Sequence, residues 1–436
     1  MLDEMNANNY NSLQMKTMKI KDVCLRMHSG GTPSTKHPEY WNGSIPWLSS
    51  SESGKNFIND ASQFITEEGV KNSATRQAKK DSVIIATAGE GKTRGQVSYL
   101  NIDAYINQSL IAMQTNPAIM ESKYLYYYLK NSYTRLRTLS NITGVRGSLS
   151  GSLLADFDIT FPELNEQKKV VSLLSSLDSK ISLNEQINRN LEELASLIYD
   201  YWFVQFDFPN EKGKPYKSCG GKMVWNCTLK REIPENWDVK SINQISTSVR
   251  GVTYNSTDEK NQDDDNVVMI LRGNNIANNK IVYDSNTVFV DSSLVSSEQF
   301  IKKFDIIMAM SSGSKEHVGK SAMAMYDLPH SYGAFCSKIV PSPSSRYFLE
   351  KFLHSDYFIK YIRQTSSGTG INNLNSRHFD NIFFAYPPDK IIDAFNSKVE
   401  PLYDRISSLQ KESEQLNKLR DFLLPLLMNG QVTLRG

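Results

Sequence analysis

The sequence predicts a mixed α/β (α+β) fold in which two globular domains each precede a long helix, and the two helices pair as an antiparallel coiled coil. Three observations support this prediction. The chain of 436 residues carries an internal repeat near half its length, a hydrophobic heptad stripe follows each copy, and the excess positive charge lies in the globular parts. A chain of this length can bury more than one core.

The internal repeat has an offset of 223 to 225 residues. A strand-like "KKDSVIIATAG" matches "KKFDIIMAMSSG", an aromatic-rich helix "YLYYYLKNSYTRL" matches "FLEKFLHSDYFIKYI", and "TGVRGSLSGSLLADFDITFP" matches "TGINNLNSRHFDNIFFAYP". The three pairs of blocks occupy residues 79–89 and 302–313, 124–136 and 348–362, and 143–162 and 369–387. Such self-similarity predicts two copies of one fold.

A long helix is predicted after each copy, because apolar residues recur at alternating steps of four and three. The expected interface positions are Val170, Leu174, Leu177, Ile181, Leu191, Ile198, Phe395, Val399, Leu402, Ile406, Leu409, Leu416 and Leu423. The polar members of the stripes are expected to lower stability and to fix the register; they are Asn184, Asn188, Ser413 and Arg420. Antiparallel pairing would hold the globular domains apart and relate them by a pseudo-two-fold axis.

These patterns divide the chain into four parts, residues 1–162, 163–208, 209–386 and 387–436. Their net charges, from Lys plus Arg against Asp plus Glu, are +3, −4, +3 and zero in that order. The globular domains are therefore the parts expected to meet an anionic partner.

The composition is that of an ordinary folded protein, with 39% hydrophobic residues and a net charge of +2. No apolar run reaches the length of a membrane span, and the N-terminus lacks the apolar stretch of a signal peptide. The four cysteines are too few and too scattered for a disulfide framework. We expect a soluble, cytoplasmic protein.

The stretch "ATAGEGKTRG" (86–95) invites a catalytic interpretation. Ala86 to Thr93 fits a relaxed phosphate-binding loop of an ATPase, and Asp81 with "EGK" (90–92) resembles a metal-dependent nuclease centre. A phosphate loop must open a helix, whereas "GQVSYLNIDAYI" indicates a strand. The second copy also keeps neither spacing. An ATPase or nuclease remains a remote alternative.

Other catalytic and metal sites find no support in the sequence. The Asn-Pro-Pro-aromatic pocket of an amino-methyltransferase is missing, and the six histidines show no metal-ligand pairing. "GSLSG" (147–151) has the letters of a hydrolase elbow, but its copy reads "NNLNS". We therefore expect no catalytic residue, no metal site and no cofactor bound by this chain.

Three further stretches resemble the specificity subunit of type I restriction–modification systems. "SGGTPSTKHPEYWNGSIPWLSS" (29–50) is similar to the opening of a target-recognition domain. Residues 160–206 resemble the central conserved region of that family, and "LNKLRDFLLPLLMNGQVTL" (416–434) resembles its C-terminal one. The second copy departs from the pattern, because "VRGVTYNS" (249–256) stands in place of the "GGTP" block.

The resemblance implies a sequence-specific DNA-binding subunit without catalytic activity of its own. Each target-recognition domain would read one half of a split double-stranded DNA target, and the helices would act as a ruler for the spacer between the halves. The helices would also dock two modification subunits, which hold S-adenosylmethionine and methylate adenine. Restriction subunits that use ATP and magnesium are further implied partners.

Candidate DNA contacts are cationic, amide and hydroxyl side chains in the Gly- and Ser-rich loops, because phosphates and base edges are bound by such groups. In the first domain they are Lys55, Lys92, Thr93, Arg94 and Arg146. In the second they are Arg250, Arg272, Asn274, Asn275, Lys315, His317, Lys320, Asn372 and Asn373. Gly89 and Gly91 are expected to allow a tight turn that presents Lys92 and Arg94.

A second class of function stays open at this point. The coiled coil and the globular domains could belong to a non-enzymatic adaptor that binds only proteins. The matched Gly-Ser-Lys loops of the two domains favour DNA.

Overall fold

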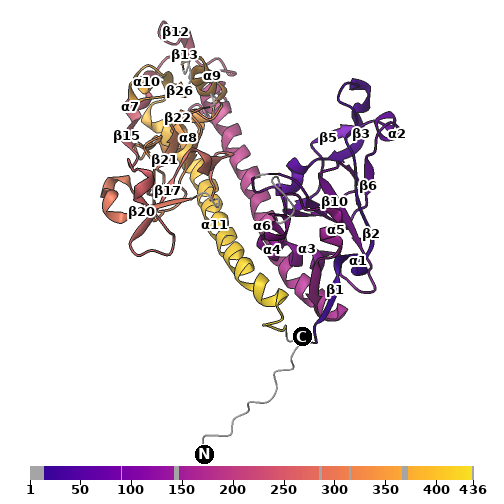
Figure 1. Cartoon of the computed structure of the whole chain (residues 1–436). Helices are drawn as coiled ribbons and strands as arrows, with labels where there is room; N and C mark the ends of the chain where they lie inside the picture. The colour runs from indigo at the N-terminus through magenta and orange to yellow at the C-terminus, as the bar shows by residue number, and fades with distance from the viewer. Residues whose placement is uncertain are drawn as a thin grey trace, which may run out of the picture. The chain divides into compact units, whose positions relative to one another are not determined.

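The computed structural model describes residues 14–89, 91–141, 147–283, 287–313, 316–365 and 372–434. The chain forms two compact units (Figure 1). Unit 1 comprises Met1–Ser182 and Ser413–Gly436, and unit 2 comprises Leu183–Glu412. Each long helix therefore contributes one stretch to unit 1 and one to unit 2.

Unit 1 is built on two β-sheets. The first has the strand order β2-β10-β7-β8-β4, and the second has the order β5-β3-β9-β6. Their strands are β2 (Cys24–Ser29), β3 (Trp41–Leu48), β4 (Phe57–Ile58), β5 (Gln63–Ile65), β6 (Arg76–Ala78), β7 (Val83–Ala86), β8 (Val97–Leu100), β9 (Ala104–Ile106) and β10 (Leu110–Thr115). A pair formed by β1 (Lys16–Lys19) and β11 (Asp158–Phe161) adds to them.

The two faces of strand β7 serve different cores, as the alternation of side chains along a strand requires. Ile84 and Ala86 pack with residues of the second sheet, whereas Val83 and Ile85 pack with the helices. The helices of unit 1 are α1 (Ile20–Val23), α2 (Glu67–Lys71), α3 (Ser122–Asn131), α4 (Tyr133–Asn141) and α5 (Gly151–Ala155), with 3₁₀ turns at Pro38–Tyr40 and Ser50–Gly54. Residues 124–129 of α3 are buried, so the tyrosine cluster belongs to the core.

Unit 2 repeats this plan. Its sheets have the orders β15-β25-β21-β23 and β16-β20-β17-β24. The strands are β15 (Ser246–Arg250), β16 (Glu259–Lys260), β17 (Val267–Leu271), β20 (Val288–Asp291), β21 (Ile306–Ala309), β23 (Ser321–Met323), β24 (His330–Tyr332) and β25 (Cys336–Pro341). Two-stranded pairs join β12 (Met223–Asn226) to β13 (Arg231–Pro234), β14 (Asp238–Ser241) to β27 (Phe383–Tyr386), β18 (Ile276–Ala277) to β19 (Lys280–Ile281), and β22 (Ser311–Ser312) to β26 (Asn372–Asn373).

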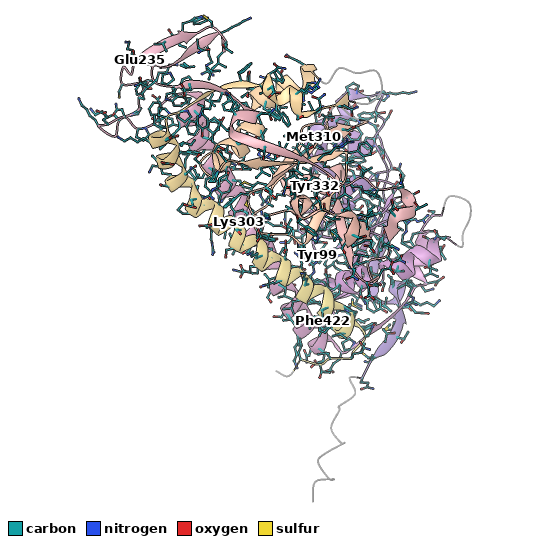
Figure 2. All side chains as sticks on the ribbon, turned by 90° about the vertical axis from the view of Figure 1, so that its left-hand side faces the viewer. Tyr99, Glu235, Lys303, Met310, Tyr332 and Phe422 are labelled. Atoms are coloured by element: carbon teal, nitrogen blue, oxygen red, sulfur yellow. The ribbon has the colours of Figure 1, made fainter. Side chains whose placement is uncertain are left out.

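The helices of unit 2 cover one face of its first sheet. They are α7 (Ile242–Ile245), α8 (Arg346–Leu353), α9 (Asp356–Thr365) and α10 (Ser376–Asp380), with short 3₁₀ turns at Ser256–Asp258, Gly273–Asn275, Ser292–Leu294 and Ser297–Gln299. Tyr347 and Phe348 of α8 share a core with Ile306 of β21. Tyr332 of β24, labelled in Figure 2, is fully buried and shares a core with Ile307 and Ala309 of β21.

The sheet orders confirm the internal repeat. In each unit the first sheet places the strand of the "SVIIA" or "FDIIMA" block between the same two neighbours, and the second sheet contains one parallel pair, β3 with β9 or β17 with β24. The edges differ, because unit 1 adds β6 beyond β9, whereas unit 2 adds β16 beyond β20.

The long helices are α6 (Leu164–Tyr199), which ends in a π-helical turn at Asp200–Val204, and α11 (Asp389–Met428). In unit 1, Asp178 of α6 pairs with Arg420 of α11, whereas Leu174 shares a core with Leu427. In unit 2, Asn184 bonds to Glu412, and Tyr199 packs on Phe395. Rising numbers on α6 meet falling numbers on α11, so the helices pair antiparallel.

Most of the predicted stripe residues are buried. Leu191, Ile198, Leu402, Leu416 and Leu423 are half-buried, and the others are buried. Of the polar members, Asn184, Asn188 and Arg420 are buried and Ser413 is half-buried. The two-copy α/β fold with two long paired helices is thus confirmed.

Over the part of the chain that the structure describes, every helix is too short or too polar to cross a membrane.

Candidate nucleic-acid interface

The loop that follows β7 is a hairpin connection, because β7 and β8 pair antiparallel. A nucleotide-binding loop would have to open a helix, so this geometry excludes the phosphate-loop interpretation of Ala86–Thr93. Asp81 precedes β7, whereas residues 91–95 follow it, and a four-residue strand separates its ends by roughly 13 Å. The hydroxyl of Tyr99 donates to the Asp81 carboxylate. The nuclease arrangement of Asp81 with Lys92 is therefore wrong; Glu90 lies outside the described residues.

Helix α4 holds this hairpin loop by its backbone carbonyls. The Tyr133 hydroxyl donates to the carbonyl of Lys92 (2.8 Å), and the Arg137 guanidinium donates to that of Gly91 (2.7 Å). The positive backbone φ angles are at Gly89 (+126°) and Gly95 (+87°). The prediction that Gly91 makes the turn is thus wrong, because Gly95 has that role. The side chain of Lys92 is exposed at the tip.

Arg94 has intramolecular partners. Its side chain is 6% exposed, and its guanidinium donates to the side-chain oxygen of Asn141 (2.6 Å) and to the carbonyl of Gly147. A Cβ atom on Gly147, whose φ is +42°, would collide with this guanidinium. Arg94 therefore ties the hairpin loop to α4 and to the residues before α5. A role of Arg94 on DNA stays a prediction.

Lys55 and the second-unit candidates lie in several loops. Lys55 is exposed and pairs with the buried Glu52 (2.7 Å). Hydrogen bonding to that carboxylate raises the pKa of Lys55. In unit 2, Arg250 is exposed at the end of β15, and Asn373 lies in β26 opposite Ser311 of β22.

The 3₁₀ turn after Arg272 contains two adjacent asparagines that differ in exposure. Asn275 is fully buried; its side chain accepts from the amide of Arg272 and donates to the carbonyl of Val282. Asn274 is exposed. The side chain of Asn275 is therefore used within the fold, and Asn274 is the one that faces solvent.

The loop between β21 and β23 corresponds to the hairpin loop of unit 1. Exposed His317 and Lys320 lie on it, with the Lys320 ammonium 2.9 Å from the Nδ1 atom of His317. Beside it stands Phe335, which is 72% exposed and whose carbonyl accepts from the amides of Met310 and Ser311. Nothing in the sequence pattern singled out this phenylalanine. Arg146, Lys315 and the side chain of Asn372 lie outside the described residues.

Close packing explains the glycines near the start of each recognition domain. A Cβ atom on Gly30 would lie 1.8 Å from the carbonyl oxygen of Ile106, and one on Gly31 would meet Ala74. In unit 2, a Cβ on Gly251 would lie 2.2 Å from the carbonyl oxygen of Gly333. The "RGV" stretch of the second copy thus performs the packing role of the "GGTP" block.

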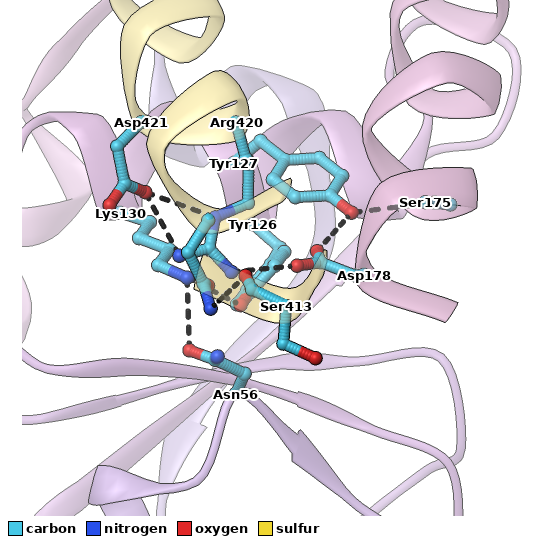
Figure 3. Close-up of polar contacts among 10 residues, drawn as sticks. Asn56, Tyr126, Tyr127, Lys130, Ser175, Asp178, Ser413, Arg420 and Asp421 are labelled. Atoms are coloured by element: carbon cyan, nitrogen blue, oxygen red, sulfur yellow. Dashed lines mark hydrogen bonds and ion pairs between the residues drawn. The ribbon is translucent and has the colours of Figure 1, made fainter. Parts of the chain in front are cut away.

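A buried polar network joins α3 to both long helices in unit 1 (Figure 3). Asp178 of α6 accepts from the Tyr127 hydroxyl (2.7 Å) and from the Arg420 guanidinium (2.9 Å). Arg420 also donates to Asp421 (2.9 Å). Burial first, and then the charge of Arg420, lower the pKa of nearby Lys130 to about 8. Its ammonium donates to Asn56 (3.0 Å), which links the network to the first sheet's edge.

Unit 2 has a corresponding network in which the tyrosine lies on the long helix and the carboxylate lies on the short helix. The hydroxyl of Tyr403, on α11, donates to Glu350 of α8. Tyr403 follows Asp178 by 225 residues, the offset of the long helices, and Glu350 lies one position before Lys351, the residue that the helix blocks align with Tyr127. The Nδ1 atom of His354 and the ammonium of Lys351 lie 3.0 and 3.4 Å from the same carboxylate.

The lowered pKa of Glu350 predicts that the fold loses stability in acid. Burial alone would raise its pKa, but the charges of Lys351 and His354 and the hydrogen bonds from His354 and Tyr403 lower the pKa to about 2. A depressed carboxyl pKa stabilises the fold above the unfolded value of 4.5, and this stabilisation is lost as the pH falls toward 2. Glu350→Gln should therefore lower the free energy of unfolding by about 3 kcal/mol at pH 7.

Urea unfolding of Glu350→Gln and wild type between pH 2 and pH 7 measures this contribution. The difference between the two proteins should shrink as the pH falls below 4.5. Glu298→Gln, at an exposed carboxylate of the same unit, is the matched control and should change little. A wild-type advantage that stays constant down to pH 2 contradicts this account of Glu350.

Two copies of one α/β fold, each carrying exposed cations on loops after matched strands, define a two-domain binding protein. The family model of the type I restriction modification DNA specificity domain matches residues 13–193 and 234–418. These ranges cover most of the chain, and one lies on each copy of the repeat. The chain belongs to this family.

The similar proteins agree with this membership. The MjaIX specificity subunit of Methanocaldococcus jannaschii is 27% identical over 429 residues, which are 95% of this chain and 92% of that protein. The EcoKI specificity subunit of Escherichia coli K12 is 34% identical over 208 residues, 46% of this chain and 44% of its own. The crystal structure of the S subunit from M. genitalium has a TM-score of 0.55 at 17% identity, covers 97% and 98% of the two chains, and supports the fold.

Proposed function

We propose that this chain is the specificity subunit of a type I restriction–modification complex, and that it binds a bipartite DNA sequence. The observation that carries the proposal is the double match of the DNA specificity domain, once on each repeat. The subunit is non-catalytic by itself. The target-recognition domains would be residues 1–162 and 209–386, and the helical segments 163–208 and 387–436 would set the spacer between two half-sites.

The complex supplies the chemistry. Two modification subunits would hold S-adenosylmethionine and methylate an adenine that is flipped from the duplex. Restriction subunits would bring ATP and magnesium, and the complex would act in the cytoplasm. Sequencing of methylated adenines in cells with and without this chain tests the proposal. A two-part methylated motif should vanish without the chain, and an unchanged pattern would count against it.

The helices offer a surface for the modification subunits. Leu194, Leu197, Tyr201 and Val204 follow one another at steps of three, four and three, and all are exposed. On α11, Leu419 and Phe422 are exposed, and Figure 2 marks Phe422, whose side chain is 66% exposed. Soluble proteins rarely leave such rows of apolar side chains uncovered. We place the docking of the modification subunits on these residues.

Lys92 is the DNA contact with the simplest expected signature. Its side chain lies exposed at the tip of a loop that Tyr133 and Arg137 hold in place. Lys92→Ala should weaken binding to all sequences and reduce the slope of log affinity against log salt by about 0.9, the value for one phosphate contact. Filter binding with random duplexes at several salt concentrations measures both quantities.

The control for Lys92→Ala is Lys16→Ala, which removes an exposed positive charge from β1. It should leave the slope unchanged. If the wild-type protein binds duplexes with no salt dependence, the chain is a protein adaptor and the DNA proposal fails. Turnover of ATP that depends on Lys92 would instead revive the ATPase alternative.

A further inference from the structure

Unit 1 contains a cationic pocket that lies outside the predicted DNA-binding loops. It has a volume of about 230 Å³. Its lining includes Arg26 and His28 of β2, Gln114 of β10, Arg76 and Gln77 of β6, and Lys79. Three elements of two different sheets thus bring three cations and an imidazole together.

The strand register explains why these side chains converge. Arg26 and His28 are two residues apart on β2, so they face the same side of the sheet. Arg26 lies opposite Gln114 and His28 lies opposite Ala112 across the β2–β10 ladder. Arg76 arrives from β6, which pairs with β9 at the edge of the second sheet.

The positive charge in this pocket is largely uncompensated. Within the described parts of the chain, the Arg26 and Arg76 guanidinium groups make no hydrogen bond or ion pair. Lys79 pairs with Asp103 (3.2 Å). Burial, and then the charges of Arg26 and Arg76, lower the pKa of His28. The Nδ1 atom of His28 is buried and lacks a hydrogen-bond partner among the described residues.

We propose that this pocket holds a backbone phosphate of the DNA target. Arginine forks bind phosphate oxygens in a bidentate manner, and the amide of Gln114 adds a neutral donor. The proposal rests on the proposed function, which supplies the polyanion, and it adds a contact that positions the first recognition domain on DNA.

The pocket is specific to the first domain. His28 corresponds to Val249 of unit 2, because the residues opposite them, Ala112 and Lys338, pair in turn with matched positions of β7 and β21. Arg76 has no counterpart among the described residues of unit 2, where no strand lies beyond β24 at the place that β6 takes in unit 1. The two domains would therefore contact the DNA phosphates with different residues.

The test compares Arg26→Gln, Arg76→Gln and the double variant with Lys16→Ala, using salt-dependent binding of the full-length chain to random duplexes. Each single change should weaken binding roughly three- to tenfold for all sequences and lower the salt slope by about 0.9. The double change should lower it by about twice as much. Unchanged urea midpoints will show that the variants fold, as expected for two exposed arginines without partners.

The outcomes separate this proposal from the one on which it rests. If Lys92→Ala lowers the slope and the arginine variants do not, the pocket is no DNA contact, but the specificity subunit stands. If wild-type binding shows no salt dependence, both fail. Titration with inorganic phosphate is the second measurement. Phosphate binding that the double variant loses, with an unchanged DNA slope, assigns the pocket to a free anion and overturns the proposal. Loss of modification-subunit binding with normal DNA binding assigns it to an acidic protein surface and also overturns it.

Discussion

Replacing Arg420 with alanine lowers the free energy of unfolding by about 3 to 5 kcal/mol, the range measured when one partner of a buried ion pair is removed. The guanidinium is buried, and its Nη1 atom lies 2.9 Å from the Asp178 carboxylate. Without it, the Asp178 carboxyl group lies in a buried site with the Tyr127 hydroxyl as its remaining hydrogen-bond donor in the described structure. The loss should therefore exceed that of an ordinary surface ion pair several-fold.

Urea unfolding measures the effect, with Lys418→Ala on the exposed side of the same helix as the matched control. The double variant Asp178→Leu with Arg420→Met should recover most of the lost stability, because it removes both charges and keeps apolar volume. A second readout is Lys130, whose pKa should rise above about 8 once the charge of Arg420 is gone. An Arg420→Ala protein as stable as Lys418→Ala contradicts the importance of the network.

The second large effect is expected for assembly. Leu197 is 65% exposed in the middle of the apolar row on α6. Leu197→Asp places a carboxylate where the proposed docking surface excludes water, and an unpaired buried charge is strongly unfavourable. Co-purification with the modification subunits should therefore be lost, whereas the unfolding of the isolated chain should change by less than about 0.5 kcal/mol.

Leu294→Asp is the control, since Leu294 is an exposed leucine of the same unit outside the helices. It should assemble normally. Normal assembly of Leu197→Asp would move the docking site elsewhere. A stable but unassembled Leu294→Asp would show that any added charge disrupts the complex, and the row on α6 would lose its special role.

The fold could be predicted where periodicity and repetition carry the information. The heptad steps located α6 and α11, and the matched blocks located β7, β21, α3 and α8, because repeated core positions leave a periodic trace in the sequence. The extra edge strands β4, β6 and β16 could not be predicted, since strands of two or three residues have no period to detect.

The candidate site was harder to predict, because it depends on which side chains the fold already uses. Arg94 and Asn275 look like surface residues in a Gly-rich stretch, yet both are buried and bonded within their own unit. Arg26 and Arg76 are 50 residues apart in sequence and converge through the pairing of two sheets. No local pattern could have indicated either outcome.

The exchanged tyrosine–carboxylate pairs limit how recognition domains can be shuffled. A first recognition domain fused to the second long helix would bring Tyr127 against Tyr403 and leave no acceptor for two hydroxyls. The converse fusion would bring Glu350 against Asp178, two carboxylates in a buried site, which repel each other. Recombination that swaps the two halves of such a gene must therefore carry each long helix together with its own domain.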